Sequence, residues 1–326
     1  MSGHIPVQLS DVMQALALQP NDHVVDGTFG AGGYSRAILE AQKDATLYAI
    51  DQDPDARIRA DAFDEEFKGR FHFMAGKFGQ MKRLLGERSV EQVDAIVLDI
   101  GVSSFHLDEA ERGFSFMQDG PLDMRMSKTG QTAADFVNTA DEETIADVLF
   151  HYGEERKSRR IAAAICKDRL QEPFTTTAQL AGLIERVLGS VRHNKKGKKP
   201  AHPATRSFQA IRIYINDELG ELRRAMRAAE EILRPGGRLV IVTFHSLEDR
   251  MVKNFMAQRS GRMGGGSRHL PQQSRQLPSF ALEKNHLIKP SDDEIALNPR
   301  SRSAKCRVAI RTQAPAWPSD GGDSDE

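Results

Sequence analysis

The amino-acid sequence predicts an α/β protein with a doubly wound, mostly parallel sheet and an all-helical domain inserted into it. Three observations support this fold class. Apolar runs of strand length alternate with amphipathic segments in the first third of the chain. The alternation stops over 108–212, where apolar residues recur only at helical spacing, and an apolar strand returns at 237–244. A last apolar run at 305–311, with an upstream partner near 285–289, predicts an antiparallel pair at the C-terminus.

The first apolar strand ends on Asp26 and passes directly into a glycine-rich turn before a helix. Gly30, Gly32 and Gly33 allow the backbone to turn sharply and to approach a ligand closely. A dinucleotide site would place a third glycine where Ser35 stands. An aspartate ahead of a Gly-x-Gly pair instead suits S-adenosylmethionine, whose amino group and sulfonium are cationic. The turn alone leaves a purely structural role open.

Each later strand is expected to end at the same edge of the sheet. Asp51 closes the second strand, where its carboxylate can accept hydrogen bonds from ribose hydroxyls, with Asp53 as the competing choice. Phe78 could lie against an adenine ring or pack in the core. Asp99 is at the switch point of the sheet, where the acceptor group is expected. The second of these strands is predicted within 46–54, the third at 71–78 and the fourth at 93–101.

Length and pattern together predict two domains. The chain has 326 residues, more than one domain usually holds. Residues 1–107 and 213–314 are expected to form the cofactor domain, and residues 108–212 the inserted helical domain. A polar stretch at 260–279 predicts a mobile loop, and the acidic residues 315–326 predict a disordered tail.

Composition says more about the cellular environment of the protein than about any reaction that it catalyses. Cys166 and Cys306 lack paired spacing, which argues against disulfides and a zinc site, so we expect no metal and a reducing cytoplasm. No apolar run has the length of a membrane span, so no membrane partner is expected. The oligomeric state stays open, and a homodimer is compatible with the sequence.

Two stretches of the chain are basic although the net charge is only -1. Neither 190–216 nor 250–275 contains an acidic residue. Charge runs are usually solvated surfaces, but two such stretches around the insertion favour an RNA-binding surface. The candidate phosphate contacts here are Lys195, Lys196, Lys198, Lys199, Arg206, Arg212 and Arg250.

Seven motifs, in order, resemble the RsmH (MraW) family over nearly the whole chain. They lie at 26–33, 98–104, 111–116, 120–126, 202–206, 244–250 and 298–303. The resemblance implies a class I S-adenosylmethionine-dependent methyltransferase with a helical substrate domain. It implies methylation of N4 of a cytosine, position 1402 of 16S rRNA, in the decoding centre of the small ribosomal subunit. Matching positions imply cofactor contacts at Gly32, Gly33, Tyr34, Asp51, Phe78, Asp99 and His106.

Two of these positions depart from the family pattern, because Tyr34 usually is His and His106 often is Gln. A backbone contact at Tyr34 would survive the change. For catalysis we expect Asp99 or a nearby carbonyl to accept a hydrogen bond from N4, with His245 and Ser246 bordering the base pocket. His245 could instead simply anchor its loop. The motif at 298–303 adds Arg300 and Arg302 as RNA contacts.

Other functions remain open from sequence alone. The cofactor half is compatible with a methyltransferase acting on DNA or protein, and a non-enzymatic RNA-binding assembly factor is a further alternative. A NAD-dependent enzyme is the third, disfavoured by Ser35. Aromatic and methionine side chains at 113–116 and 121–126 could stack on a flipped cytosine or pack the hinge between the domains.

Overall fold

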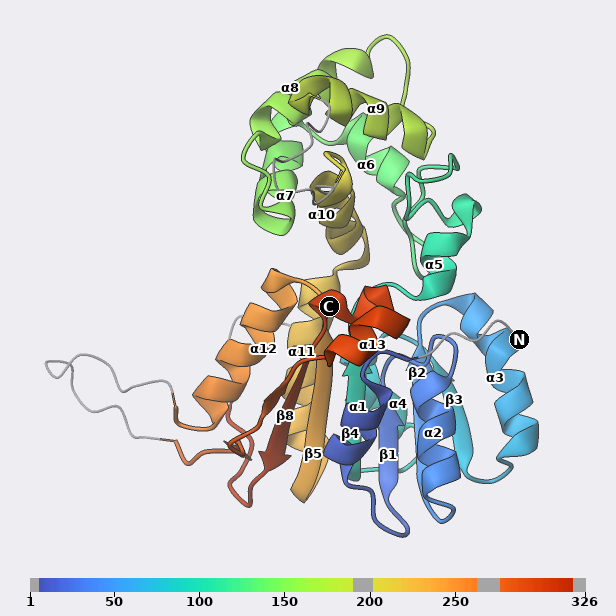
Figure 1. The fold of residues 1–326 in the computed structure, drawn as a ribbon, viewed down its shortest axis with the longest axis vertical. Coiled ribbons are helices and arrows are strands. Elements are labelled where there is room, and N and C mark those ends of the chain that lie inside the picture. The colour runs from blue at the N-terminus through green and yellow to red at the C-terminus, as the bar shows by residue number, and fades with distance from the viewer. Residues whose placement is uncertain (1–5, 190–201, 263–275, 319–326) are drawn as a thin grey trace, which may run out of the picture. The chain divides into compact units, whose positions relative to one another are not determined.

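A computed structural model of the chain describes residues 6–189, 202–262 and 276–318, and the chain forms two compact units (Figure 1). The first unit comprises Met1–Gly101 and Leu219–Glu326, and the second comprises Val102–Glu218. The chain therefore leaves the first unit once and then returns to it. The second unit begins before residue 108 and ends after residue 212, so the sequence placed both boundaries too far inside the insertion.

Over the described residues, the first unit contains one eight-stranded sheet in the order β3-β2-β1-β4-β5-β8-β6, with β7 also paired to β8. Strands β3, β2, β1, β4 and β5 run parallel, whereas β8 is antiparallel to β5, β6 and β7. This is the mixed, doubly wound sheet that the sequence predicted. The strands are β1 (His23–Asp26), β2 (Thr46–Asp51), β3 (Phe71–Ala75), β4 (Val93–Asp99), β5 (Leu233–Thr243), β6 (Phe280–Ala281), β7 (Leu287–Ile288) and β8 (Lys305–Arg311).

Helices cover both faces of this sheet (Figure 1). Apolar side chains of α1, α2 and α3 form a core with one face, and those of α4, α11 and α12 form a core with the other. The strands are buried on both sides, which is why they read as continuous apolar runs. The helices are α1 (Leu9–Leu16), α2 (Gly33–Ala41), α3 (Pro54–Glu66), η1 (Phe78–Gln80), α4 (Met81–Gly86), α11 (Glu218–Ile232), α12 (Ser246–Arg259), α13 (Asp292–Leu297) and η3 (Pro299–Ser303).

The parallel strands bring three aspartates to one edge of the sheet. Asp26, Asp51 and Asp99 are the last residues of β1, β2 and β4. In the strand register, Asp26 pairs with Ala49 of β2 and with Val97 of β4. Neighbouring parallel strands therefore place the three carboxylates beside the glycine turn that follows β1.

Two expectations for the first unit need correction. Strand β3 ends at Ala75 rather than at residue 78, because the chain there turns into the short helix η1. The tail is also ordered at its start: the Trp317 indole donates a 2.8 Å hydrogen bond to the Leu277 carbonyl, and the Trp317 amide donates to Glu230 Oε1 at 3.1 Å. Residues 319–326 of the expected tail, and 263–275 of the expected loop, lie outside the described residues.

The second unit is helical over its described residues, apart from one β-bridge between Pro121 and Thr176. Its helices bury a separate apolar core that includes Phe136, Ile161 and Ile184. No helix in the described part of either unit has the combined length and apolarity that crossing a membrane requires. The helices of this unit are α5 (Ser104–Asp108), η2 (Ala110–Arg112), α6 (Ala133–Thr139), α7 (Glu142–Gly153), α8 (Ser158–Asp168), α9 (Thr177–Leu188) and α10 (Thr205–Asn216).

Candidate active site

The buried side chain of Asp26 holds the glycine turn in place by hydrogen bonds to Thr28 and Ser35. Its carboxylate is buried, and it accepts a 2.7 Å hydrogen bond from the Ser35 hydroxyl and a 3.1 Å hydrogen bond from the Thr28 amide. Burial, with a smaller contribution from the charge of Asp51, raises the pKa of Asp26 to about 6 although these hydrogen bonds lower it. Both oxygens are thus engaged within the turn. Ser35, which breaks the dinucleotide pattern, fixes the aspartate instead.

The turn needs glycine at Gly32 for two reasons. Its φ of 78° lies in the left-handed region, and a Cβ there would come within 2.4 Å of the Phe63 ring. At Gly33, the first residue of α2, a Cβ would lie 2.2 Å from Pro6 Cγ. These two glycines therefore let the turn pack closely against the rest of the first unit.

Asp51 and Asp53 have different roles. Asp51 Oδ2 accepts a 2.7 Å hydrogen bond from the Gly30 amide, and Oδ1 accepts one of 2.8 Å from the Asp53 amide. Asp53 is buried, caps α3, and accepts a hydrogen bond from the Asp55 amide. The half-buried Asp51 is therefore the carboxylate presented at the sheet edge, and Asp53 is a helix cap.

Tyr34 directly follows the glycine turn in α2, and Phe78 packs near the start of the turn. The Tyr34 side chain is buried in the core, where its hydroxyl donates a hydrogen bond to the Val7 carbonyl. Burial raises the pKa of Tyr34 well above its ordinary value. Phe78 is half-buried, and its Cβ lies 3.3 Å from where a Cβ on Gly27 would be. Phe78 therefore packs on the core while it borders the start of the turn.

Asp99 has a pKa that is shifted more than that of Asp26. Its amide donates a 2.7 Å hydrogen bond to Thr28 Oγ1, but its carboxylate Oδ1 is buried without a hydrogen-bond partner among the described residues. Burial, together with the charges of Asp26 and Glu248, raises the pKa of Asp99 to about 8. A buried acceptor without a partner costs about 1 to 3 kcal/mol. Such groups are concentrated at functional sites.

His245 and Glu248 order the loop between β5 and α12. Glu248 is fully buried, and its Oε2 accepts hydrogen bonds from the amides of Phe244 at 2.8 Å and His245 at 3.2 Å. Its Oε1 lies 2.7 Å from His245 Nε2. Sequence reasoning assigned Glu248 no role, although its position three residues after the helix cap is a known capping signal. Ser246 is exposed at the first residue of α12.

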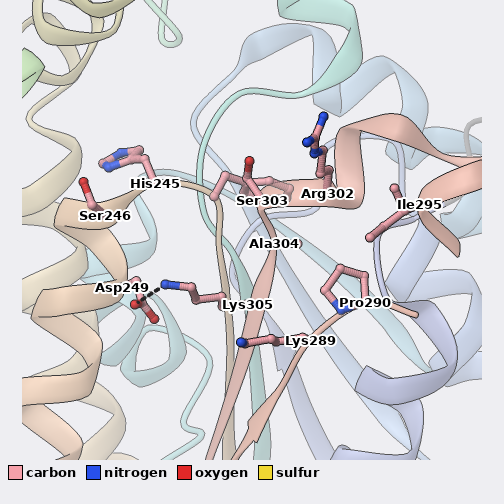
Figure 2. A pocket seen from close by; sticks show the side chains of 11 residues that line it. His245, Ser246, Asp249, Lys289, Pro290, Ile295, Arg302, Ser303, Ala304 and Lys305 are labelled. Atoms are coloured by element: carbon pink, nitrogen blue, oxygen red, sulfur yellow. Dashed lines mark hydrogen bonds and ion pairs between the residues drawn. The ribbon is translucent and has the colours of Figure 1, made fainter. Parts of the chain in front are cut away.

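A hollow of about 430 Å³ opens in the first unit beside His245 and Ser246 (Figure 2). Its walls come from the start of α12, the connection leading to α13, the end of η3 and the start of β8. Asp249 on its wall accepts hydrogen bonds from Lys305 Nζ at 2.7 Å and from Arg307 Nε at 2.8 Å. Although burial opposes ionisation, these hydrogen bonds lower the pKa of Asp249.

The predicted RNA contacts divide into different environments. Arg212 is a correction, because its guanidinium forms two hydrogen bonds of 2.7 and 2.9 Å with Glu218 and both side chains are largely buried. Arg206 is exposed, and its guanidinium donates a 3.4 Å hydrogen bond to the Glu154 carbonyl. Arg302 lines the hollow. Arg250 and Arg300 are also exposed, whereas Lys195, Lys196, Lys198 and Lys199 lie outside the described residues.

His106 belongs to the second unit. It is buried in the first turn of α5, where its Nδ1 accepts a 3.2 Å hydrogen bond from the Ser103 amide and its ring stacks on Phe114 with centroids 4.7 Å apart. Phe114 and Met126 are buried in the core of this unit, and Phe116 packs against that core. The side chains considered for base stacking therefore serve packing here.

The sheet order with its antiparallel β8, the glycine turn after β1, and the aspartates ending β1, β2 and β4 define a class I methyltransferase. The chain belongs to the MraW methylase family, whose sequence profile matches residues 1–312.

Several proteins of similar sequence carry the name ribosomal RNA small subunit methyltransferase H. One from Rhodospirillum rubrum is 54% identical over 322 residues, covering 97% of each chain. One from Caulobacter vibrioides is 53% identical over 319 residues, covering 98% of each chain. Among solved structures, an rRNA methylase from Streptococcus thermophilus aligns over 96% of this chain and 99% of its own, with 12% identity and a TM-score of 0.41.

Proposed function

We propose that the protein transfers the methyl group of S-adenosylmethionine to N4 of a cytosine, position 1402 of 16S rRNA, in the small ribosomal subunit. Family membership and the names of its relatives support an rRNA substrate. The structural observation that carries the proposal is the buried Asp99 Oδ1, an acceptor without a partner among the described residues at the edge where the glycine turn lies. An rRNA substrate would place the enzyme in the cytoplasm.

The charges around the turn fit a cationic cofactor. Asp26 lies close enough to Asp51 and Asp99 for their charges to interact, and Glu248 adds to the field at Asp99. This concentration of carboxylates would repel a pyrophosphate, which disfavours a dinucleotide, but it attracts an ammonium and a sulfonium. Asp51, held by two backbone amides, is oriented to accept hydrogen bonds from ribose hydroxyls. Bound there, S-adenosylmethionine would supply an electrophilic methyl group.

Asp99 has the properties of the hydrogen-bond acceptor for N4. The lone pair of the cytosine amine is conjugated into the ring, so a group that accepts N4–H favours its alignment with the methyl group. A neighbouring cation lowers a carboxyl pKa, so the cationic sulfonium would shift Asp99 toward the ionised acceptor. As the N–C bond forms and the C–S bond breaks, the N4 proton would pass to Asp99 Oδ1. The raised pKa suits this oxygen to hold it.

Other residues of the chain would position the base and the RNA strand. Glu248 holds the loop of His245 and Ser246, and that loop would border the base. The helical second unit would recognise the substrate, with the lysines of 195–199 as phosphate contacts. Arg212 has no part in this surface, because it is paired with Glu218.

The test combines mapping of the product with a matched pair of variants. Small subunits from cells that lack the protein would be incubated with it and labelled cofactor, and the methylated nucleotide would be identified by mass spectrometry. Asp99→Asn should lower kcat by about 100-fold or more, with cofactor affinity within a few-fold of wild type. The control, Asp94→Asn, changes the opposite end of the same strand and should keep normal turnover.

Two outcomes would contradict the proposal at different points. A methyl group on another nucleotide, on DNA or on protein would refute the acceptor. Full turnover by Asp99→Asn, with normal cofactor binding, would refute the role of Asp99 and leave the acceptor intact. Undetectable cofactor binding by calorimetry would favour the non-enzymatic assembly factor.

A further inference from the structure

The hollow beside α12 carries an excess of positive charge. Its lining includes three cations, Lys289, Arg302 and Lys305, against one carboxylate, Asp249, which leaves a net charge of +2. Asp249 is already held by Lys305 and by Arg307 behind it. Lys289 and Arg302 are both exposed, and neither forms an ion pair with a described residue. On a chain with a net charge of -1, this is a local site for an anion.

The hollow also has the right surroundings for a phosphate. Ser246 on its wall is the first residue of α12, a helix of 14 residues whose N-terminus favours an anion. Figure 2 shows Ser246 on one wall and Lys289 and Arg302 on the other. The volume of about 430 Å³ accommodates a group larger than a free ion, in the range of sites that hold a small organic ligand.

The position of the hollow links it to the reaction edge. Asp99 pairs in register with Val242 of β5, two residues before Phe244 on the wall of the hollow. Glu248 contributes to the field at Asp99 and belongs to the same first turn of α12 as Ser246 and Asp249. An anion in the hollow would thus lie one strand away from the base that Asp99 contacts.

We infer that this hollow binds a phosphodiester group of the substrate RNA strand, next to the nucleotide that is methylated. The inference rests on the proposed function and makes it more specific. Lys289, Arg302 and the N-terminus of α12 bind the phosphate, while Asp249 holds Lys305 in place. The acidic edge at Asp99 and the basic hollow then receive two parts of one strand, the target base and its backbone.

The test neutralises the two unpaired cations in the double variant Lys289→Gln/Arg302→Gln. A control double variant, Lys43→Gln/Lys68→Gln, removes the same charge from exposed lysines that do not line the hollow and lie outside the two basic stretches. Binding of a single-stranded RNA fragment that contains the target cytosine is measured against salt concentration. The hollow variant should bind about 10-fold more weakly, and its log–log salt slope should be smaller by about 0.7 for each phosphate that it no longer neutralises. The control and the cofactor affinity should stay near wild type.

Methylphosphonate linkages, which are uncharged, would then identify the phosphate. One substitution next to the target should weaken binding by the wild type but not by the hollow variant, because the variant no longer binds that phosphate. Equal salt slopes in wild type and hollow variant, or equal sensitivity of both to every uncharged linkage, would overturn the inference. Weaker binding to assembled subunits with unchanged binding to the fragment would also overturn it, in favour of an acidic protein surface. If the wild type does not bind or methylate RNA, the proposed function itself fails, which is a different result.

Discussion

Replacing Asp99 with Asn should change the pH dependence of folding as well as the reaction. The substitution keeps the shape of the side chain but removes a carboxyl group whose Oδ1 is buried without a partner among the described residues. In the folded protein, burial and the charges of Asp26 and Glu248 raise the pKa of Asp99 from 3.8 to about 8. The ionised form of this group is therefore unfavourable in the folded state.

The sign and size of the effect follow from this shift. Below about pH 4 the carboxyl group is protonated in both states and has no cost. Between about pH 4 and pH 8 the folded protein holds a proton that the unfolded chain has lost, so the wild type loses about 1.4 kcal/mol of stability per pH unit. The rise from 3.8 to about 8 is roughly four units, so the total is at most about 6 kcal/mol. Above about pH 8 the difference is constant.

Urea denaturation of the wild type and Asp99→Asn, at several values between about pH 5 and pH 9, measures this directly. The free energy of unfolding of the variant, relative to the wild type, should increase steadily up to about pH 8 and then level off. Asp94→Asn, at the other end of β4, should not show that increase. A difference between wild type and Asp99→Asn that is the same at every pH would refute the reasoning, because it would mean that Asp99 ionises as easily in the folded protein as in the unfolded chain.

Three further substitutions test individual contacts. Tyr34→Phe removes the hydrogen bond to the Val7 carbonyl and should lower the free energy of unfolding by about 1 kcal/mol. Cofactor affinity by calorimetry should be unchanged, and a weaker affinity would instead place the side chain at the ligand. Gly32→Ala should lower the free energy of unfolding by about 2 kcal/mol in thermal or urea denaturation, because φ is 78° and the added Cβ would lie 2.4 Å from an aromatic ring. It should also weaken cofactor binding at least about 10-fold, and normal affinity would contradict the role of the turn. Arg212→Gln leaves Glu218 buried and unpaired, so the free energy of unfolding should fall by about 3 kcal/mol while the folded protein keeps its RNA affinity. Unchanged stability in denaturation with weaker RNA binding would restore Arg212 as an RNA contact.

The edge with the aspartates could be predicted because its signals are local. An apolar run that ends on a carboxylate places Asp26, Asp51 and Asp99 at strand ends, and parallel pairing then brings strand ends together. Their different states could not be predicted. Asp26 is held by a hydroxyl and an amide, whereas Asp99 Oδ1 has no described partner, and this contrast depends on how other segments pack around each carboxylate.

The basic residues show why charge runs mislead. Arg212 lies in a stretch without acids, but α10 ends at its C-cap Asp217, whose φ of 49° is left-handed, and the next residue, Glu218, pairs with the guanidinium. Lys289 is the reverse case, because it stands outside the basic stretches and still lines the hollow. The sequence predicted the pairing of β7 with β8, but not that this pairing places Lys289 on the wall of the hollow.

The buried side chain of Glu248 connects the His245 loop, the carboxyl group of Asp99 and the wall of the hollow, which lie apart in the sequence. It holds the loop of His245, contributes to the raised pKa of Asp99, and belongs to the helix turn that forms one wall of the hollow. Two zones of opposite sign therefore meet at the start of α12: carboxylates that suit a cationic methyl donor, and a hollow around Lys289 that suits a phosphate. A net charge of -1 conceals this separation, because the zones offset each other in the sum. If the cationic methyl donor bound in the hollow and the RNA strand bound at the acidic edge, each would lie beside charge of its own sign. The separation of the two zones therefore disfavours that exchanged arrangement.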